Sequence, residues 1–461
     1  MISGRNSGDL KVSVSGVRGI VGRSLTPALA AGFTAAFGEF VGGGKVVVGR
    51  DTRRSGEMIE YAVVASLLAA GCQPVLAGIV PTPTLQILVG QQQANGGIMI
   101  SASHNPMEWN ALKFIGADGI FLNDVESGQL LDLYNQPERR YAEEADYRRV
   151  RTLEDPFAPH QEKIFRHVDV AAIRRCHFKV AADCCNGAAA LYTRKFLTAL
   201  GCEVLTINDQ PDGIFRRNPE PTPANLTELS RVVRENGCAI GFAQDPDADR
   251  IGLVDNRGNP VSEQYALVMA ADHILSDKPG RVVVNLQTTK AVEDVARSYG
   301  CETYYTKVGE INVTEKMLQC KAVIGGEGNS GGIIYPAVHP CRDSFTAMAL
   351  LLEMLALSCD TVDNILASLP RYYSAGRKYA CPANRARLLI RTLKQRYADR
   401  QPITADGIRI NLERGWVLIR PSNTESVLRL IVEAASPTEA QQLLEEFDRE
   451  INRQLTPTEK T

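Results

Sequence analysis

The sequence predicts an α/β protein: three similar α/β units with mixed sheets around a central cleft, followed by a smaller C-terminal α+β domain. The first observation behind this prediction is a threefold recurrence of one order of elements, in which two strands flank a helical stretch and a third strand runs into a polar loop. The second is a change of pattern after about residue 372. The length of 461 residues exceeds what one core usually serves. We therefore expect four domains, at residues 1–152, 153–258, 259–370 and 371–461.

Each repeat opens with a strand rich in β-branched residues, and its helical stretch ends in Gly-Cys. The first strands are expected at residues 45–51, 178–183 and 281–286. The Gly-Cys pairs are Gly71-Cys72, Gly201-Cys202 and Gly300-Cys301. Glycine suits these positions because many helices end in a left-handed residue. Chance recurrence of Gly-Cys is the alternative explanation.

The third strand of each repeat leads into a loop that carries polar chemistry. These strands are expected at residues 97–100, 239–243 and 322–325, and the loops that follow are residues 101–106, 245–250 and 326–332. With right-handed crossovers, each loop leaves the same edge of its sheet, so three units packed side by side would direct their loops into one cleft.

The C-terminal segment has a different pattern. Strands are expected at residues 408–412, 416–420 and 428–433. A closing helix is expected to begin at Ser436-Pro437, where serine is a favoured N-cap, proline fits the first helical position and Glu439 completes a capping box. These features indicate a small α+β domain.

Composition limits the classes of partner. The formal net charge is −2, and lysine and arginine are scattered along the chain, which argues against nucleic acid or an anionic membrane as the main partner. The N-terminus has no apolar targeting segment, and the most apolar stretch, residues 347–359, is interrupted by Glu353. We expect a cytoplasmic protein. The eleven cysteines show no CxxC spacing, so they indicate neither a zinc site nor a disulfide framework.

The first polar loop, Ser101-Ala102-Ser103-His104-Asn105-Pro106, directly follows an apolar strand. Ser103 is therefore a candidate nucleophile, with His104 beside it and Lys113 nearby. A plain Ser/Asn turn closed by proline would have the same composition.

The second loop, Asp245-Pro246-Asp247-Ala248-Asp249-Arg250, carries a carboxylate at every second residue. So much negative charge in a short loop favours a bound hard cation such as Mg²⁺. An EF-hand is excluded because its glycine position is Arg250 and its final glutamate position is Asn256. A solvated acidic turn is the alternative.

The third loop, Gly326-Glu327-Gly328-Asn329-Ser330-Gly331, matches the dinucleotide pattern GxGxxG. Dinucleotide binding requires the loop to lead into the N-terminus of a helix, but the sequence of residues 332–336 predicts extended chain. Glu327, Asn329 and Ser330 instead suit the binding of hydroxyl groups. A plain glycine loop is the alternative.

The fourth loop combines a guanidinium, two hydroxyls and an amide, a composition that suits a phosphate. It contains Arg420, Ser422, Asn423 and Thr424, followed by Arg429. A hairpin turn capped by Ser and Asn is also compatible. Near the N-terminus, Arg18 is flanked by Gly16 and Gly19. In isolation, this pattern predicts a surface turn.

Taken in this order, the four loops resemble the α-D-phosphohexomutase family over essentially the whole chain. The resemblance matches residues 101–106 to the active-serine motif and makes Ser103 the residue that carries the phosphoryl group. It makes Asp245, Asp247 and Asp249 the Mg²⁺ ligands, with the Ser103 phosphate also touching the metal. It assigns Arg18, His104 and Lys113 to catalysis. The substrate-binding residues that it implies are Arg250, Glu327, Asn329, Ser330, Arg420, Ser422, Asn423, Thr424 and Arg429.

Three positions depart from common family patterns. In the third loop an extra residue separates Glu327 from Ser330, and Gly332 stands where many members have histidine, which leaves open whether Asn329 or Ser330 contacts the sugar. Ala111 replaces a common glycine, and Glu310 stands where some gluco/mannomutases have histidine. These features are closer to those of the archaeal-type and phosphoglucosamine-mutase-like branches of the family.

The resemblance implies a phosphohexomutase that moves a phosphoryl group between O6 and O1 of a hexose phosphate, with Mg²⁺, phosphoserine and a hexose 1,6-bisphosphate intermediate. Glucosamine phosphate is the favoured substrate, and glucose or mannose phosphate is the alternative. We expect a monomer or homodimer. Two other classes stay open: a phosphosugar-binding protein without turnover, and a metal-dependent phosphatase with a seryl intermediate.

Overall fold

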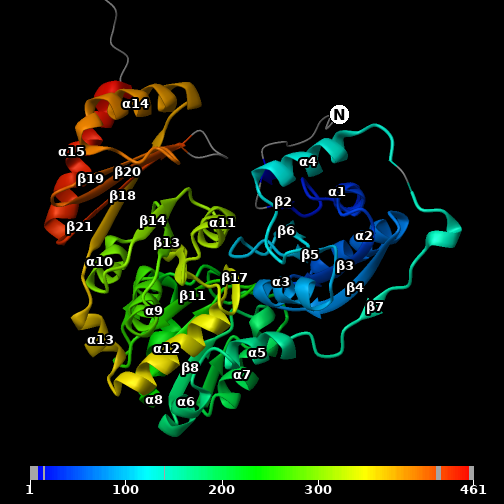
Figure 1. Ribbon diagram of the computed structural model, residues 1–461, viewed down its shortest axis with the longest axis horizontal. Coiled ribbons are helices and arrows are strands. Elements are labelled where there is room, and N and C mark those ends of the chain that lie inside the picture. The colour runs from blue at the N-terminus through cyan, green and yellow to red at the C-terminus, as the bar shows by residue number, and fades with distance from the viewer. Residues whose placement is uncertain (1–8, 14–15, 140, 422–426, 456–461) are drawn as a thin grey trace, which may run out of the picture.

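The computed structural model describes residues 9–13, 16–139, 141–421 and 427–455, and within them it contains four β-sheets (Figure 1). The first has seven strands in the order β1-β2-β6-β5-β3-β4-β7. The second and third have five strands each, in the orders β12-β11-β10-β8-β9 and β14-β13-β15-β16-β17. The fourth has the order β18-β21-β20-β19. This confirms the predicted fold class of three mixed α/β units and a C-terminal α+β unit.

The threefold repeat is visible in the strand order, because each of the first three sheets contains the same four-strand block. The blocks are β6-β5-β3-β4, β11-β10-β8-β9 and, written in the same sense, β16-β15-β13-β14. In each block the first three strands along the chain are parallel and the fourth is antiparallel. The bounds are β3 Gly44–Arg50, β4 Cys72–Ile79, β5 Gly96–Ile100, β6 Trp109–Gly116, β8 Lys179–Asp183, β9 Glu203–Ile207, β10 Ile240–Gln244, β11 Ile251–Val254, β13 Val282–Asn285, β14 Thr303–Thr306, β15 Ile324–Glu327 and β16 Gly332–Tyr335.

Further strands extend these sheets beyond the shared blocks. They are β1 Lys11–Ser13, β2 Gly16–Ile20, β7 Arg151–Thr152, β12 Pro260–Val261 and β17 His339–Arg342. Arg18 therefore lies on β2, opposite Ala111 of β6, and not in the surface turn that its flanking glycines would allow.

Helices cover the first three sheets. They are α1 Pro27–Phe40, α2 Gly56–Ala69, α3 Thr82–Gln91, α4 Asp124–Asn135, α5 Ala158–Phe165, α6 Val170–Cys176, α7 Thr193–Ala199, α8 Thr227–Asn236, α9 Gln264–Asp277, α10 Lys290–Ser298, α11 Glu310–Cys320, α12 Ser344–Ser358 and α13 Val362–Ser368. The Gly-Cys prediction is confirmed, because Gly71, Gly201 and Gly300 follow the ends of α2, α7 and α10 with φ of 75°, 84° and 69°.

The hydrophobic cores do not divide into one per repeat. A single continuous cluster joins the second and third sheets; it extends from Phe157 to Leu369, also includes Ile87 of α3, and contains most of the buried residues of α12. The first sheet has separate clusters on its two faces, which include Phe37 and Met99. The second and third repeats thus form one packed body, because α12 buries its apolar residues against both.

The C-terminal sheet consists of β18 Tyr373–Ala380, β19 Ile408–Leu412, β20 Gly415–Pro421 and β21 Val427–Ala434, with α14 Ala383–Arg396 and α15 Pro437–Leu455 packed on it. The cap predicted for α15 is present: Ser436 Oγ accepts a hydrogen bond from the Glu439 N–H at 3.2 Å and donates to its carboxylate at 2.9 Å. Sequence reasoning did not identify β18, an edge strand whose polar residues show no alternation, or α14.

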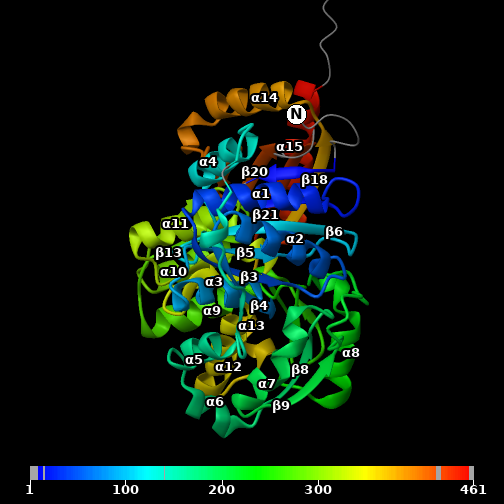
Figure 2. The same cartoon turned by 90° about the vertical axis from the view of Figure 1, so that its right-hand side faces the viewer.

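Figures 1 and 2 agree that α14 and α15 lie at the opposite end of the molecule from α6. The first sheet lies at the right of Figure 1, and the second and third lie below and to its left. Among the described helices, none is by itself long and apolar enough to span a membrane; α12 and α13 reach the required composition only together, as a pair bent by 86°.

Candidate active site

The first polar loop, residues 101–106 and here called the serine loop, begins where β5 ends. Short hydrogen bonds hold it in place. Ser103 has φ of 49°, an uncommon left-handed conformation for serine, and it is 3% exposed. Its backbone N–H donates to Ser101 Oγ at 2.9 Å, and Ser101 Oγ donates to the Asp51 carboxylate at 2.7 Å. These bonds define the direction of the Ser103 side chain.

Arg53, in the segment that follows the neighbouring strand β3, holds the same loop. Its guanidinium donates to the carbonyl of Ser103 at 2.7 Å and to the carbonyl of Asn105, and it is ion-paired with Asp51. Arg53 is 1% exposed, and the ring of Phe215 from the second repeat lies 4.9 Å from its guanidinium. A buried arginine therefore fixes the backbone that presents Ser103.

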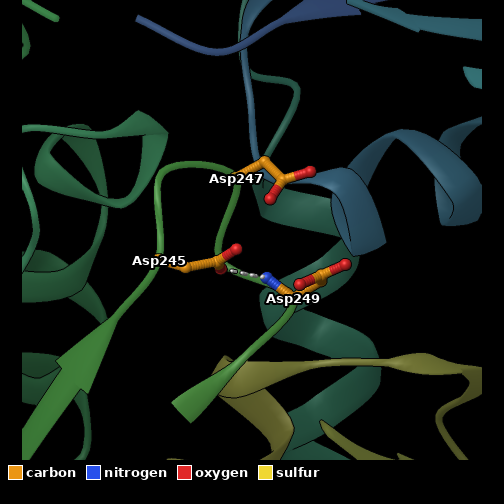
Figure 3. Close-up of side chains that lie close together, drawn as sticks. All are labelled: Asp245, Asp247 and Asp249. Carbon is orange, nitrogen blue, oxygen red and sulfur yellow. Dashed lines mark hydrogen bonds between the residues drawn. The ribbon is translucent and has the colours of Figure 1, made fainter. Parts of the chain in front are cut away.

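The metal loop, residues 245–250, connects β10 to β11, and its three aspartates lie close together (Figure 3). All three are buried. One carboxylate oxygen from each of Asp245, Asp247 and Asp249 lies within 4.8 Å of the others. Oδ1 of Asp247 and Oδ1 of Asp249 are buried and have no hydrogen-bond partner in the described part of the chain. Unpartnered buried carboxylate oxygens are costly unless a cation meets them, so this donor set fits a hard divalent cation such as Mg²⁺.

Ser103 meets this loop across the boundary between the first and second repeats. Its Oγ donates to Asp245 Oδ2 at 2.7 Å and lies 3.4 Å from His104 Nδ1. Lys113, on β6, places its Nζ 2.6 Å from Asp247 Oδ2 and 4.0 Å from Asp249 Oδ2. The candidate nucleophile, the lysine and the three carboxylates thus form one buried cluster.

Burial and neighbouring charges shift several pKa values here. Burial, followed by repulsion from Asp249 and Asp247, raises the pKa of Asp245 well above its ordinary value. Burial also opposes ionisation of Asp247, but the contacts of Lys113 and Thr82 with its carboxylate outweigh burial and hold its pKa below the ordinary value. Burial and then the nearby Arg250 and Arg18 lower the pKa of His104 to about 2, which leaves its imidazole neutral at pH 7.

The third loop, residues 326–332, is here called the sugar loop. After β15 it forms one short 3₁₀ turn, Gly328–Ser330, and leads into β16. This confirms that the GxGxxG sequence does not open an α-helix. Glu327 is buried, and its Oε1 accepts hydrogen bonds from Asn285 at 2.8 Å and from the Gly309 N–H at 2.7 Å. Asn329 bonds to Asn285 and Gln287, and Ser330 Oγ donates to the Glu327 carbonyl at 3.1 Å.

A cavity of about 370 Å³ borders the serine, metal and sugar loops and reaches the C-terminal sheet. Its walls include residues from three of the four sheets and from the loops between them: Arg18, Ser103, His104, Lys113, Arg250, Glu310, Glu327, Arg342, Arg420 and Arg429. Asn329 and Ser330 lie outside this lining. With six cationic side chains, the cavity is suited to an anion such as a phosphorylated sugar.

The predicted phosphate loop is described only at its two ends. Arg420 on β20 and Arg429 on β21 are paired across the sheet, and Arg420 Nε lies 2.6 Å from Asp406 Oδ2. Ser422, Asn423 and Thr424 lie outside the described residues. The two arginines therefore mark where the fourth sheet reaches the cavity.

Comparison with known proteins covers nearly the whole chain. Four family models match in order: domains I, II and III of the phosphoglucomutase/phosphomannomutase α/β/α type at residues 9–140, 158–258 and 262–373, and the C-terminal domain at residues 374–450. The chain belongs to the phosphoglucomutase/phosphomannomutase family. The α-D-phosphohexomutase resemblance of the sequence is thereby confirmed.

Individual relatives agree with this membership. A Methanopyrus kandleri protein named probable phosphoglucosamine mutase is 37% identical over 439 residues, which is 94% of this chain and 96% of that protein. A Thermococcus kodakarensis protein named phosphoglucomutase/phosphomannomutase is 35% identical and covers 93% and 96% of the two chains. The crystal structure of a phosphoglucomutase/phosphomannomutase family protein from Burkholderia thailandensis is 27% identical, covers 96% and 98% of the chains, and superimposes with a TM-score of 0.84.

Three residues of the site were not predicted. Thr82 Oγ1 donates to Asp247 Oδ2 at 2.6 Å, Arg53 holds the serine loop, and Arg342 contacts Asp249 and Glu327. A local signal existed for Arg53 and Thr82, which follow β3 and β4 at the edge of the sheet where the serine loop also emerges.

Proposed function

We propose that this protein is a phosphohexomutase that moves a phosphoryl group between O6 and O1 of a hexose phosphate, with Ser103 as the residue that carries phosphate. The observation that carries the proposal is the 2.7 Å hydrogen bond from Ser103 Oγ to Asp245, made at a cavity that Glu327 and Arg420 also line. A nucleophile, a metal-binding loop, a hydroxyl-binding acid and an anion-binding arginine share one space. Family membership supports the same reaction.

The proposed step begins with Ser103 phosphorylated. The free hydroxyl oxygen of the hexose phosphate attacks phosphorus, so a new sugar O–P bond forms as the Ser103 Oγ–P bond breaks. The hydroxyl proton passes to a base of the site, and Ser103 Oγ takes up a proton. The product is the hexose 1,6-bisphosphate, which turns over and returns its other phosphoryl group to Ser103. We assign proton transfer and charge balance to His104, Lys113 and Arg18, which line the cavity beside Ser103.

Asp245, Asp247 and Asp249, together with the phosphate carried on Ser103, are the proposed Mg²⁺ ligands. A bound Mg²⁺ would neutralise negative charge that develops on the transferring phosphoryl group. Lys113 contributes in the same sense by holding Asp247 in place.

The rest of the cavity is proposed to hold the substrate. Arg420, Ser422, Asn423, Thr424 and Arg429 would bind the phosphate that is not reacting, and Arg250, Glu327, Asn329 and Ser330 would bind the sugar and its charge. We propose that the segments 1–152, 153–258, 259–370 and 371–461 act as four domains, each of which supplies one loop. Because the bisphosphate must turn over, the fourth domain is proposed as a closing lid.

Among hexose phosphates, we propose glucosamine 6-phosphate and glucosamine 1-phosphate as the favoured pair. The support is the naming of the Methanopyrus kandleri relative as a probable phosphoglucosamine mutase. The Thermococcus kodakarensis relative, named phosphoglucomutase/phosphomannomutase, supports glucose and mannose phosphates as the alternative.

Phosphorus NMR tests the proposal directly. The protein is given Mg²⁺, a trace of hexose 1,6-bisphosphate and, in separate tubes, glucosamine 6-phosphate, glucose 1-phosphate or mannose 1-phosphate. We expect conversion to the isomer, fastest for glucosamine, and no conversion by Ser103→Ala. Release of inorganic phosphate would indicate a phosphatase, and substrate binding without any conversion would indicate a non-catalytic binding protein. Full turnover by Ser103→Ala would overturn the assignment of the nucleophile.

A further inference from the structure

The space beside Gly332, at the start of β16, is filled by the side chain of Arg342. A Cβ added to Gly332 would lie 2.4 Å from Arg342 Cδ and 3.0 Å from Arg342 Cγ. Real Cβ atoms essentially never approach another heavy atom so closely, so any side chain at position 332 would displace the arginine. The glycine at this position is thus explained by packing against Arg342.

Arg342 uses its side-chain nitrogens on three different carboxylates. Nε donates to Glu310 Oε2 at 3.0 Å, Nη1 donates to Glu327 Oε2 at 3.0 Å, and Nη2 donates to Asp249 Oδ2. Its backbone N–H donates to the other oxygen of Glu310 at 3.2 Å. The residue is 9% exposed. A guanidinium is planar and rigid, so fixing one of these carboxylates constrains the positions of the other two.

The three carboxylates belong to separate parts of the site. Asp249 is in the metal loop, Glu327 ends β15 at the sugar loop, and Glu310 begins α11. Arg342 itself ends β17. One side chain therefore joins the metal loop of the second repeat to the sugar loop of the third.

This contact also determines which oxygen of Asp249 is available. Oδ2 is held by Arg342, and Oδ1 is buried without a hydrogen-bond partner among the described residues; the nearest nitrogen of Arg250 is 3.7 Å away. Asp247 shows the same division, because Lys113 and Thr82 hold its Oδ2 and leave Oδ1 unpartnered. In both aspartates a basic side chain holds one oxygen and leaves the other for a cation.

We propose that Arg342 is a positioning residue that couples the metal loop to the sugar loop, orienting Asp249 for the cation and Glu327 for the sugar. The inference rests on the proposed function, since it assumes that these two loops bind Mg²⁺ and a hexose phosphate. Because the Arg342 guanidinium bonds to both Asp249 and Glu327, the position of one carboxylate constrains the position of the other. Loss of the guanidinium geometry should therefore weaken the binding of Mg²⁺ and of the sugar phosphate together, although neither Asp249 nor Glu327 is itself changed.

The test is Arg342→Lys, which keeps the positive charge but loses the planar guanidinium and its fixed set of N–H donors. Binding of Mg²⁺ and, separately, of glucosamine 6-phosphate is measured by titration calorimetry on the dephosphorylated protein, which needs no turnover. We expect at least about tenfold weaker Mg²⁺ binding, as is typical when a residue that orients a metal ligand is changed, together with weaker sugar phosphate binding. The matched control is Arg297→Lys on α10, an exposed arginine that also pairs with carboxylates, Glu293 and Asp294. It should leave both affinities unchanged.

A double-mutant cycle separates positioning from general support of the fold. Gly332→Ala should weaken Mg²⁺ binding in the parent protein because its Cβ displaces Arg342, and it should have little further effect on Arg342→Ala, where that side chain is gone. Arg342→Lys keeps the test decisive if Arg342→Ala fails to fold.

Unchanged Mg²⁺ and sugar phosphate affinities in Arg342→Lys, or effects of Gly332→Ala that are the same in both backgrounds, would overturn the inference. A parent protein that shows neither Mg²⁺ binding nor isomerisation would instead overturn the proposed function.

Discussion

Replacing Arg53 is the sharpest test of how Ser103 is held. In the structure its guanidinium is the donor to two loop carbonyls, those of Ser103 and Asn105, and it is the cationic partner of the buried Asp51. Arg53→Met keeps a long apolar side chain but removes both functions. We expect a less stable protein and a misplaced serine loop.

The expected loss of stability follows from what the substitution leaves behind. Asp51 is 0% exposed, and it would keep only the hydrogen bonds from Ser101 Oγ and from the backbone N–H of residue 53. Breaking a buried ion pair by removing one partner typically costs about 3–5 kcal/mol. Arg53→Met should fall in this range. Arg53→Met combined with Asp51→Asn removes the uncompensated charge and should recover most of the stability.

Activity should respond differently from stability. Neither variant restores a donor to the Ser103 and Asn105 carbonyls, and a displacement of about 1 Å at a reacting group can reduce the rate on the order of 100-fold. Urea unfolding gives the free energy of unfolding, and phosphorus NMR gives kcat for the same preparations. If the double variant were stable and turned over at the parent rate, Arg53 would not position the serine loop, and the reasoning would be refuted.

Two further predictions concern the metal loop and acid stability. Asp247→Asn should weaken Mg²⁺ binding by at least about tenfold, because it removes a carboxylate whose Oδ1 is free for the cation; unchanged calorimetric binding would contradict the assignment of this loop. His339, which donates to the Gly119 carbonyl at 2.9 Å, has its pKa lowered to about 4 by burial. The folded protein therefore binds fewer protons than the unfolded chain between pH 6.5 and pH 4, so this residue's contribution to stability is lost as the pH falls through that window, by about 2 kcal/mol at pH 5. Urea unfolding at pH 7 and pH 5 should show a smaller pH dependence in His339→Gln than in the parent protein, and equal dependence would disprove this role.

Local sequence was sufficient to predict the repeats and their loops. The strand at residues 45–51, the glycine at position 71 and the capped helix that begins at Pro437 all depend on neighbours a few residues away. Turn and cap chemistry is local, so it can be recognised without knowledge of the fold. Strand β18 was missed because its only reason to be extended is its pairing with β21, some fifty residues further along the chain.

The sequence by itself determined the fold class, the order of the four loops and the polar side chains that each one carries. Only the tertiary structure decided how those loops meet. The bond from Ser103 to Asp245 spans 142 residues, and the contact of Arg342 with Asp249 spans 93. The tertiary structure also decided that Glu327 lines the cavity, while Asn329 lies outside that lining and bonds to Asn285 and Gln287. Ser330 also lies outside it and bonds to the carbonyl of Glu327. The physical reason is that the partner of a buried charge is chosen by the packing of whole sheets and helices, and a single arginine or lysine carries no local pattern that reveals which carboxylate it will neutralise.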